Sequence, residues 1–175
     1  MRKKESFAVV NIKDSVMRYV VGRDALHNCE PNCYHRSSHV IVEVVGGRIL
    51  IQLKAHGTEN EGKWSSSVSG HVAALETYKS AAIREAKEEI GIDISDGLEF
   101  ICKIPPCEKT GNEHVSLFTY LMDDATELID IDKEEVVEVR VCKLNDIIKD
   151  ISRNANAYSP AFILAMKYFL EIYEK

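Results

Sequence analysis

Basic charge is in short supply in this chain of 175 residues. Lysine and arginine number 22 against 28 aspartate and glutamate residues, which gives a formal net charge of −6. No basic stripe runs along the sequence, and Lys3-Lys4 is only a terminal pair. Because proteins that bind a nucleic-acid backbone carry clustered positive charge, we expect no nucleic-acid partner.

Long apolar stretches are also missing. The longest are far shorter than the roughly 20 residues that a membrane span needs, and the N-terminus has no apolar signal-peptide core. We therefore expect a cytoplasmic protein without a membrane partner. With 45% hydrophobic and 29% charged residues, the chain fits one globular domain over residues 1–175.

Cysteine is sparse and odd in number. A chain of this size can fold without cross-links, so we expect reduced thiols and no structural disulfide. The five thiols are those of Cys29, Cys33, Cys102, Cys107 and Cys142.

Hydrophobic patterning predicts a mixed sheet with helices on both faces. Strands are expected at residues 7–12, 16–21, 40–45, 49–53, 68–72, 98–104, 115–122 and 136–142. Helices are expected at 77–90 and 144–151, and a third opens at Ser159-Pro160. The polar, glycine-containing residues 56–63 are expected to form a loop that covers the site or selects the substrate.

Residues 70–92, GHVAALETYKSAAIREAKEEIGI, carry most of the chemical information. On a helix that turns 100° per residue, Glu85, Glu88 and Glu89 fall within an arc of roughly 100°, beside a stripe of small and aliphatic residues. Three carboxylates so close repel one another unless cations neutralise them. Hard oxygen ligands grouped in this way suit Mg²⁺ or Mn²⁺. Most glutamate-rich helices are only solvated faces, but here two glycines, Gly70 and Gly91, stand in register with the charges.

This pattern resembles the Nudix box in every charged and glycine position, the one soft departure being the small Ala86. The resemblance implies an α/β/α sandwich with a mixed sheet. It also implies hydrolysis of a phosphoanhydride bond in a nucleoside diphosphate linked to another moiety, or in a related diphosphate. The expected cofactor is Mg²⁺ or Mn²⁺, with more than one ion, and the expected partner is the small-molecule diphosphate itself.

The resemblance further implies residue roles. Arg84 orients the catalytic glutamate, and Glu85 binds metal or acts as base. Glu88 and Glu89 are expected metal ligands, Glu89 also catalytic, with the Gly70 carbonyl as a further ligand. An additional base or ligand could come from His71, Glu113, Glu134 or Glu135, although most such acidic residues are simply solvated.

Residues 22–141 also look like the Nudix subgroup related to isopentenyl-diphosphate isomerase. The isomerases use a cysteine shortly after a tryptophan, whereas Trp64 is followed here by Ser65-Ser66-Ser67-Val68-Ser69. The missing thiol favours hydrolysis over isomerisation. An isomerase-like enzyme with a displaced acid–base pair and a non-catalytic nucleotide-binding Nudix domain stay open as alternatives.

A second metal site is a further open question. His27, His35, His71 and Glu113 lie near the positions of the isomerase's second site. By composition, the set His27, Cys29, Cys33 and His35 resembles zinc ligands, but its spacing matches no standard finger. Histidines and thiols without metal are the favoured interpretation. The sequence determines neither the substrate-binding residues nor the oligomeric state, for which a homodimer is one option.

Overall fold

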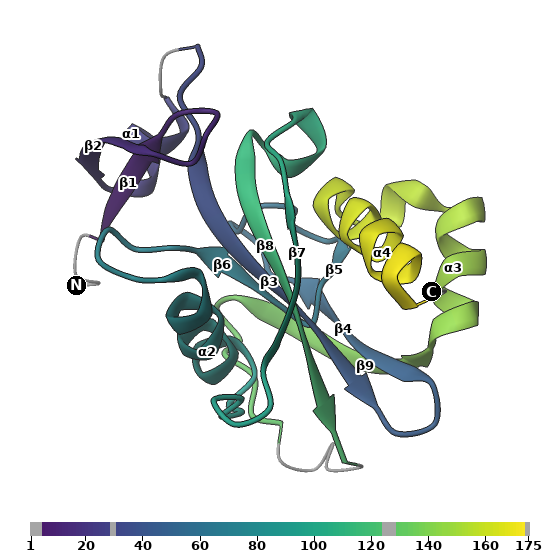
Figure 1. Ribbon diagram of the computed structural model, residues 1–175. Coiled ribbons are helices and arrows are strands. Elements are labelled where there is room, and N and C mark those ends of the chain that lie inside the picture. Colours follow the sequence, from purple (N-terminus) through teal and green to yellow (C-terminus); the bar gives the residue numbers. More distant parts are fainter. Residues whose placement is uncertain (1–4, 29–30, 124–128, 174–175) are drawn as a thin grey trace.

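The computed structural model describes residues 5–28, 31–123 and 129–173, and within them seven strands form one mixed sheet (Figure 1). The order β5-β4-β3-β8-β7 forms its backbone, while β6 pairs with β3 and β9 pairs with β4. Only β3 and β8 run parallel; the other pairs are antiparallel. The expected mixed sheet is confirmed. The strands are β3 (His35–Val44), β4 (Arg48–Lys54), β5 (Trp64–Ser65), β6 (Val68–His71), β7 (Glu99–Ile104), β8 (Glu113–Met122) and β9 (Val136–Lys143).

The hairpin of β3 and β4 parts soon after its turn. Gly46 and Gly47 have φ of 92° and 69°, conformations that glycine adopts without strain, and so make the turn that the sequence predicts. Beyond the pairs Glu43↔Ile49 and Val44↔Arg48, β3 continues along β6, and β4 continues along β5 and β9. Two neighbouring strands thus reach different partners, which brings the middle of β3, β4 and β6 to one site.

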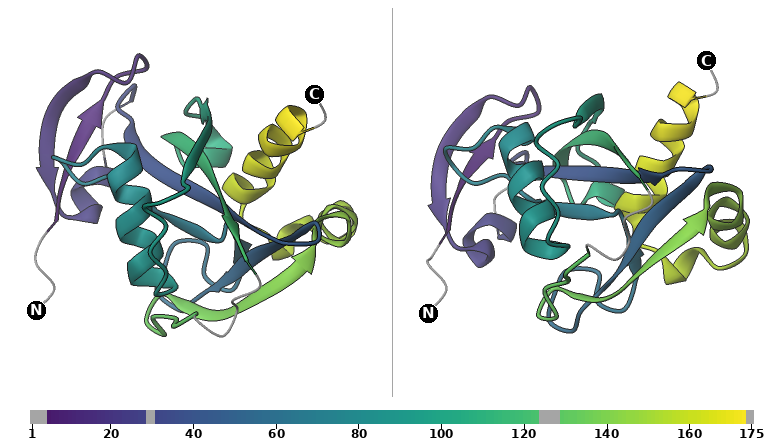
Figure 2. Two further views of the ribbon diagram at one scale, coloured as in Figure 1. Left: turned by 60° about the horizontal axis from the view of Figure 1, so that its bottom comes forward. Right: turned by 90° about the horizontal axis from the view of Figure 1, so that it is seen from below.

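Helices cover both faces of the sheet, as expected (Figure 2). On one face, α2 (Tyr78–Glu89) buries Ala82 and Ala86 against Val40 and Leu50. The opposite face carries α3 (Leu144–Arg153) and α4 (Pro160–Tyr173), with a second core cluster around Ile41. Successive strand residues point to opposite faces of the sheet, so Val40 packs in the cluster under α2 and Ile41 packs in the cluster on the other face.

The ends of α2 follow from local sequence. Thr77 is the N-cap; its Oγ1 accepts the Ser80 amide at 3.0 Å, and the Ser80 hydroxyl accepts the Thr77 amide at 2.9 Å. At the other end Gly91 has φ of 73°, and a Cβ there would come within 2.9 Å of the Asp130 carbonyl oxygen. The predicted helix at 77–90 is confirmed to within its caps.

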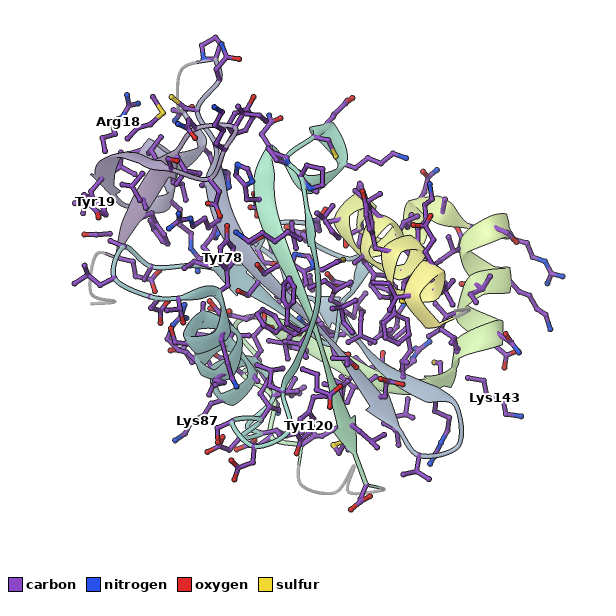
Figure 3. All side chains as sticks on the ribbon, in the orientation of Figure 1. Arg18, Tyr19, Tyr78, Lys87, Tyr120 and Lys143 are labelled. Carbon is purple, nitrogen blue, oxygen red and sulfur yellow. The ribbon has the colours of Figure 1, made fainter. Side chains whose placement is uncertain are left out.

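An N-terminal unit of β1 (Ser6–Val10), β2 (Val16–Val21) and the short α1 (Arg23–His27) packs beside the main sheet. Its hairpin is the one that the sequence predicts, but α1 was not expected. Tyr78, the first residue of α2 and labelled in Figure 3, reaches this hairpin, and its hydroxyl donates to Asp14 at 3.0 Å. The hairpin is therefore fixed to the helix that carries the motif.

The largest differences between the strands and the sequence prediction concern β3 and β5. β3 begins at His35, five residues before the expected position, because its first half is polar (HRSSH) and lacks an apolar pattern. β5 was not expected; it places Trp64 partly buried against the second core cluster. Within the described residues the fold also includes the 3₁₀ turns η1 (Glu108–Thr110) and η3 (Ala155–Ala157). No helix within the described residues is long and apolar enough to cross a membrane.

Candidate active site

One arginine on α2 holds the loop and the glutamates of the motif together. The Arg84 guanidinium donates to both carboxylate oxygens of Glu76, at 2.7 and 2.9 Å, and to the His71 carbonyl at 3.0 Å. It also donates to Glu85 at 2.7 Å and to Glu88 at 2.9 Å. The orienting role expected for Arg84 stays a prediction, and these contacts give it a structural basis.

Three carboxylates converge beside this arginine. Oxygens of Glu85, Glu89 and Glu135 lie within 4.8 Å of one another, a spacing at which all three could hold one cation. Glu135 comes from the loop before β9, far away in sequence. Glu88 instead has an exposed side chain bonded to Arg84, and its role as a metal ligand stays a prediction. The donor set, all carboxylate oxygens, fits a hard divalent cation.

Burial makes Glu85 a weaker acid than an ordinary glutamate. Its side chain is almost fully enclosed, and burial together with the neighbouring Glu89 carboxylate raises the pKa of Glu85 to about 7, against the opposing pull of Arg84. A Cβ on Gly70 would overlap the Glu85 carboxylate, so only glycine allows β6 to approach it this closely. Gly70 therefore lies where a backbone ligand was expected, although its ligand role stays a prediction.

Glu89 is held from β4 and β6. The Gln52 amide donates to its Oε2 at 3.0 Å and the Ser69 backbone amide does so at 2.9 Å, while the Lys54 ammonium pairs with Oε1. Glu89 is 1% exposed and Lys54 is 9% exposed, so this ion pair is buried. No role was expected for Lys54. A polar pair inside an otherwise aliphatic strand (ILIQLK) was the available indication.

A second cluster joins β3, β6 and β8. The parallel register pairs His35 with Glu113, whose Oε1 lies 2.8 Å from His35 Nε2 and 3.1 Å from His71 Nε2. The His27 ring on α1 lies 5.1 Å from that of His35 and 5.2 Å from that of His71. The two facing histidines hold the pKa of Glu113 well below its usual value, despite burial.

The histidine nitrogens of this second cluster are close enough to hold a cation. Ligand atoms of His27, His35 and His71 lie within 4.8 Å of one another, as do those of Glu59, His71 and Glu113. The His–Glu interpretation of the second metal site therefore has a geometric basis. Cys29, needed for the zinc interpretation, lies outside the described residues, and Cys33 is partly buried beside the apolar cluster of Phe7, Val9 and Leu26.

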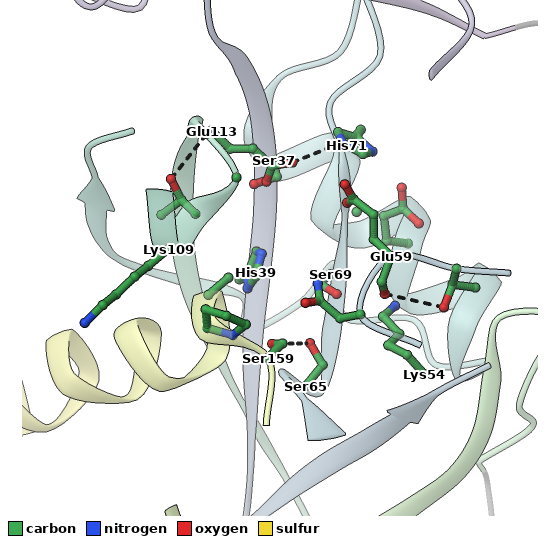
Figure 4. Close-up of a pocket in the computed structure, with 18 of the residues that line it drawn as sticks. Ser37, His39, Lys54, Glu59, Ser65, Ser69, His71, Lys109, Glu113 and Ser159 are labelled. Atoms are coloured by element: carbon green, nitrogen blue, oxygen red, sulfur yellow. Dashed lines mark hydrogen bonds and ion pairs between the residues drawn. The ribbon is translucent and has the colours of Figure 1, made fainter. Parts of the chain in front are cut away.

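A cavity of about 360 Å³ opens over both clusters (Figure 4). Glu85, Glu89 and Glu135 line it on one side, and His71 and Glu113 line it from the second cluster. Residues 58–60 also border it, so the loop 56–63 lies where a lid was expected. Its function as a lid stays a prediction.

The NUDIX domain model among known protein families matches residues 34–162 of this chain. The chain belongs to the Nudix family. A prenyl-diphosphate phosphatase from Methanosarcina mazei is 31% identical over 129 residues, which are 73% of this chain and 74% of that protein. Nudix hydrolase 3 of Arabidopsis thaliana is 30% identical over 138 residues, but this chain spans only 18% of its length.

Further Nudix relatives include isopentenyl-diphosphate isomerases, among them that of Salmonella arizonae. The fold is also seen in a crystal structure from Deinococcus radiodurans, with a TM-score of 0.76 at 17% identity, over 94% of this chain and 99% of that one. The expected α/β/α Nudix architecture is thus confirmed.

No thiol lines the cavity of this Nudix chain within the part that the structure describes. Ser65 and Ser69 border it instead; they belong to the segment after Trp64, in which the isomerases have their cysteine. Cys102 and Cys142 instead pack partly buried against the cluster beneath α4. The four described cysteines, Cys33, Cys102, Cys107 and Cys142, are free.

Proposed function

We propose that this Nudix chain is a metal-dependent hydrolase that cleaves a phosphoanhydride bond in a nucleoside diphosphate-linked or related diphosphate. The observation that carries the proposal is the cluster of Glu85, Glu89 and Glu135 at the cavity wall. Glu85 and Glu89 are buried and Glu135 is partly buried, and carboxylates so close repel one another even with Arg84 and Lys54 beside them. These three residues would hold a divalent cation, which would offset that repulsion.

The protein side of the reaction follows from the same contacts. Bound divalent metal would activate water and stabilise the charge that develops on the phosphate oxygens. Arg84 fixes the Glu85 carboxylate, and Lys54 fixes Glu89, so both acids keep their orientation toward the cavity. Without metal, burial raises the pKa of Glu85 to about 7; a bound divalent cation would lower it, so Glu85 would act as metal ligand or base in its ionised form. Glu113 and Glu135 are the other candidates for the base.

The test is a screen of nucleoside di- and triphosphates, nucleotide sugars and prenyl diphosphates with Mg²⁺ or Mn²⁺. We expect at least one to release phosphate or a monophosphate. Glu85→Gln and Glu89→Gln should each lower kcat by roughly 10² or more, the usual effect of losing one acid–base or electrostatic group. Glu99→Gln makes the same change on an exposed strand and should have no effect. Full activity of either site variant, or of wild type in excess chelator, would refute the proposal.

An isomerase-like function is the second candidate, favoured by the His35–His71–Glu113 cluster and by the isomerase relatives. Isomerisation needs a group that gives or takes a proton at carbon, and the cavity offers serines where a thiol would act. We therefore expect isopentenyl diphosphate to keep its double bond in place. Formation of dimethylallyl diphosphate at a catalytic rate would favour the isomerase. Inactivity toward every substrate would favour the binding module.

A further inference from the structure

Four serines line part of the cavity wall. We call Ser37, Ser65, Ser69 and Ser159 the serine wall; they come from β3, β5, β6 and the residue before α4. Figure 4 shows His39, Ser65 and Ser159 grouped on the side of α4, across from Lys54. Pro160, Ala161 and Gly111 also line the cavity, as do Glu108, Lys109 and Thr110 of η1, and Figure 4 shows Lys109 beside α4.

Strand geometry explains why these polar side chains meet. On β3, His35, Ser37 and His39 alternate toward the face that carries the cavity. The antiparallel register sets Ser37 opposite His71 and His39 opposite Ser69. The Ser65 and Ser159 hydroxyls lie 3.2 Å apart. The polar start of β3, which concealed this strand in the sequence, is therefore the part that borders the cavity.

Ser37 and His39 are buried, yet each has a polar group that can form a hydrogen bond to a ligand. Ser37 is 3% exposed, and its hydroxyl has no hydrogen-bond partner among the described residues. An unpaired buried hydroxyl is costly, and a ligand that hydrogen-bonds to it removes that cost. Burial lowers the pKa of His39 to about 4, so its ring is neutral and offers one donor and one acceptor. Its Nδ1 lies 3.0 Å from the Ser66 hydroxyl.

The lining fits poorly with two kinds of substrate tail. A prenyl chain placed here would give the buried Ser37 hydroxyl no hydrogen bond. Within the described residues, no Leu, Ile, Val, Met, Phe, Tyr or Trp lines the cavity, so it offers no apolar slot and no Phe, Tyr or Trp face for a nucleobase; the rings that line it are the His39 and His71 imidazoles.

Building on the hydrolase function above, we propose that the group joined to the diphosphate is a hydroxylated carbon skeleton, a sugar or polyol, which binds the serine wall and His39. The selectivity differs from that of a prenyl-diphosphate enzyme and also from recognition of a base. A site built to pair with substrate hydroxyls discriminates against an analogue that lacks them, because its own polar groups are then left unpaired.

Three diphosphate esters test this selectivity. Ribose 5-diphosphate and dimethylallyl diphosphate are both five-carbon esters, one hydroxylated and one apolar, and adenosine diphosphate adds a base to the ribose ester. We expect kcat/KM for ribose 5-diphosphate to exceed that for dimethylallyl diphosphate by roughly tenfold or more, and the base to add less than roughly threefold. Equal or reversed preference between the five-carbon esters, or a tenfold gain from the base, would overturn this inference and leave the hydrolase function intact.

Failure of the hydrolase function itself is distinguishable. If none of the three esters is cleaved, the hydrolase proposal loses its support, and calorimetric binding to the metal-loaded protein decides the inference separately. Ribose 5-diphosphate should then bind more tightly than dimethylallyl diphosphate. Equal or weaker binding would overturn the inference.

Two serine variants test the serine wall directly, one at the cavity and one as its matched control. Ser37→Ala breaks no hydrogen bond within the described protein, and it should lower the ratio of the two five-carbon kcat/KM values by roughly fivefold to tenfold. Ser116→Ala makes the same change at a buried serine on β8 that does not line the cavity, and the ratio should not move. A ratio unchanged in Ser37→Ala would count against the serine wall.

Discussion

The replacement of Glu85 by glutamine should stabilise the metal-free protein at alkaline pH. The ordinary pKa of a glutamate is 4.5, and in the fold that of Glu85 is raised to about 7. Between these values the folded protein keeps a proton that the unfolded chain releases. The stability that this proton provides is complete below pH 4.5 and is lost as the pH rises through 7.

The size of the effect follows from the shift. One pKa unit corresponds to about 1.4 kcal/mol, so the ionised Glu85 side chain costs about 3.5 kcal/mol of folding free energy, of which about 3 kcal/mol develops between pH 4.5 and 8. Glutamine has nearly the same shape and stays neutral at every pH. We therefore expect Glu85→Gln and wild type to have similar free energies of unfolding near pH 4.5, and the variant to be more stable by about 3 kcal/mol at pH 8.

The assay is urea unfolding in the presence of chelator, followed by the fluorescence of Trp64, the single tryptophan, from pH 4.5 to 8. Titrating groups distant from Glu85 behave alike in both proteins and cancel in the difference. Glu99→Gln should give a difference that does not change with pH. If the Glu85→Gln difference is equally flat, or if wild type is the more stable protein at pH 8, the reasoning from burial is refuted. Mg²⁺ added at pH 8 should stabilise wild type more than the variant.

The other predictions concern the neighbours of Glu85 and the thiols. Lys54→Met leaves the buried Glu89 carboxylate without its cation, and should lower the unfolding free energy of metal-free protein by about 3 kcal/mol in urea titrations; an unchanged midpoint would contradict a buried pair. Gly70→Ala forces a methyl group against Glu85, and should lower stability by about 1–3 kcal/mol together with kcat; a fully active, equally stable variant would contradict that contact. The cysteines should be reduced in protein purified without oxidant, so a mass gain of two hydrogens per pair on reduction would count against this expectation.

Much of the fold could be predicted because its causes are local. Thr77 and Gly91 mark the ends of α2, and Gly46-Gly47 marks a hairpin, since caps and turns depend on a few adjacent residues. Prediction was wrong at the start of β3 and missed α1, because neither has an apolar period of its own. The start of β3 is fixed by β6 and β8, which are distant in sequence, whereas α1 packs Leu26 against Phe7 and Val9 of the neighbouring hairpin.

The sequence by itself determined the family, the carboxylate-bearing helix and the arginine within it, because 3.6-residue periodicity places Arg84, Glu85 and Glu89 on neighbouring parts of one helix. Only the tertiary structure decided which side chains complete the site. It places Lys54 and the partly buried Glu135 beside the buried carboxylates of Glu85 and Glu89, and it leaves the Glu88 side chain exposed. Strand register and loop placement depend on packing across the whole chain, and spacing along the sequence does not specify them.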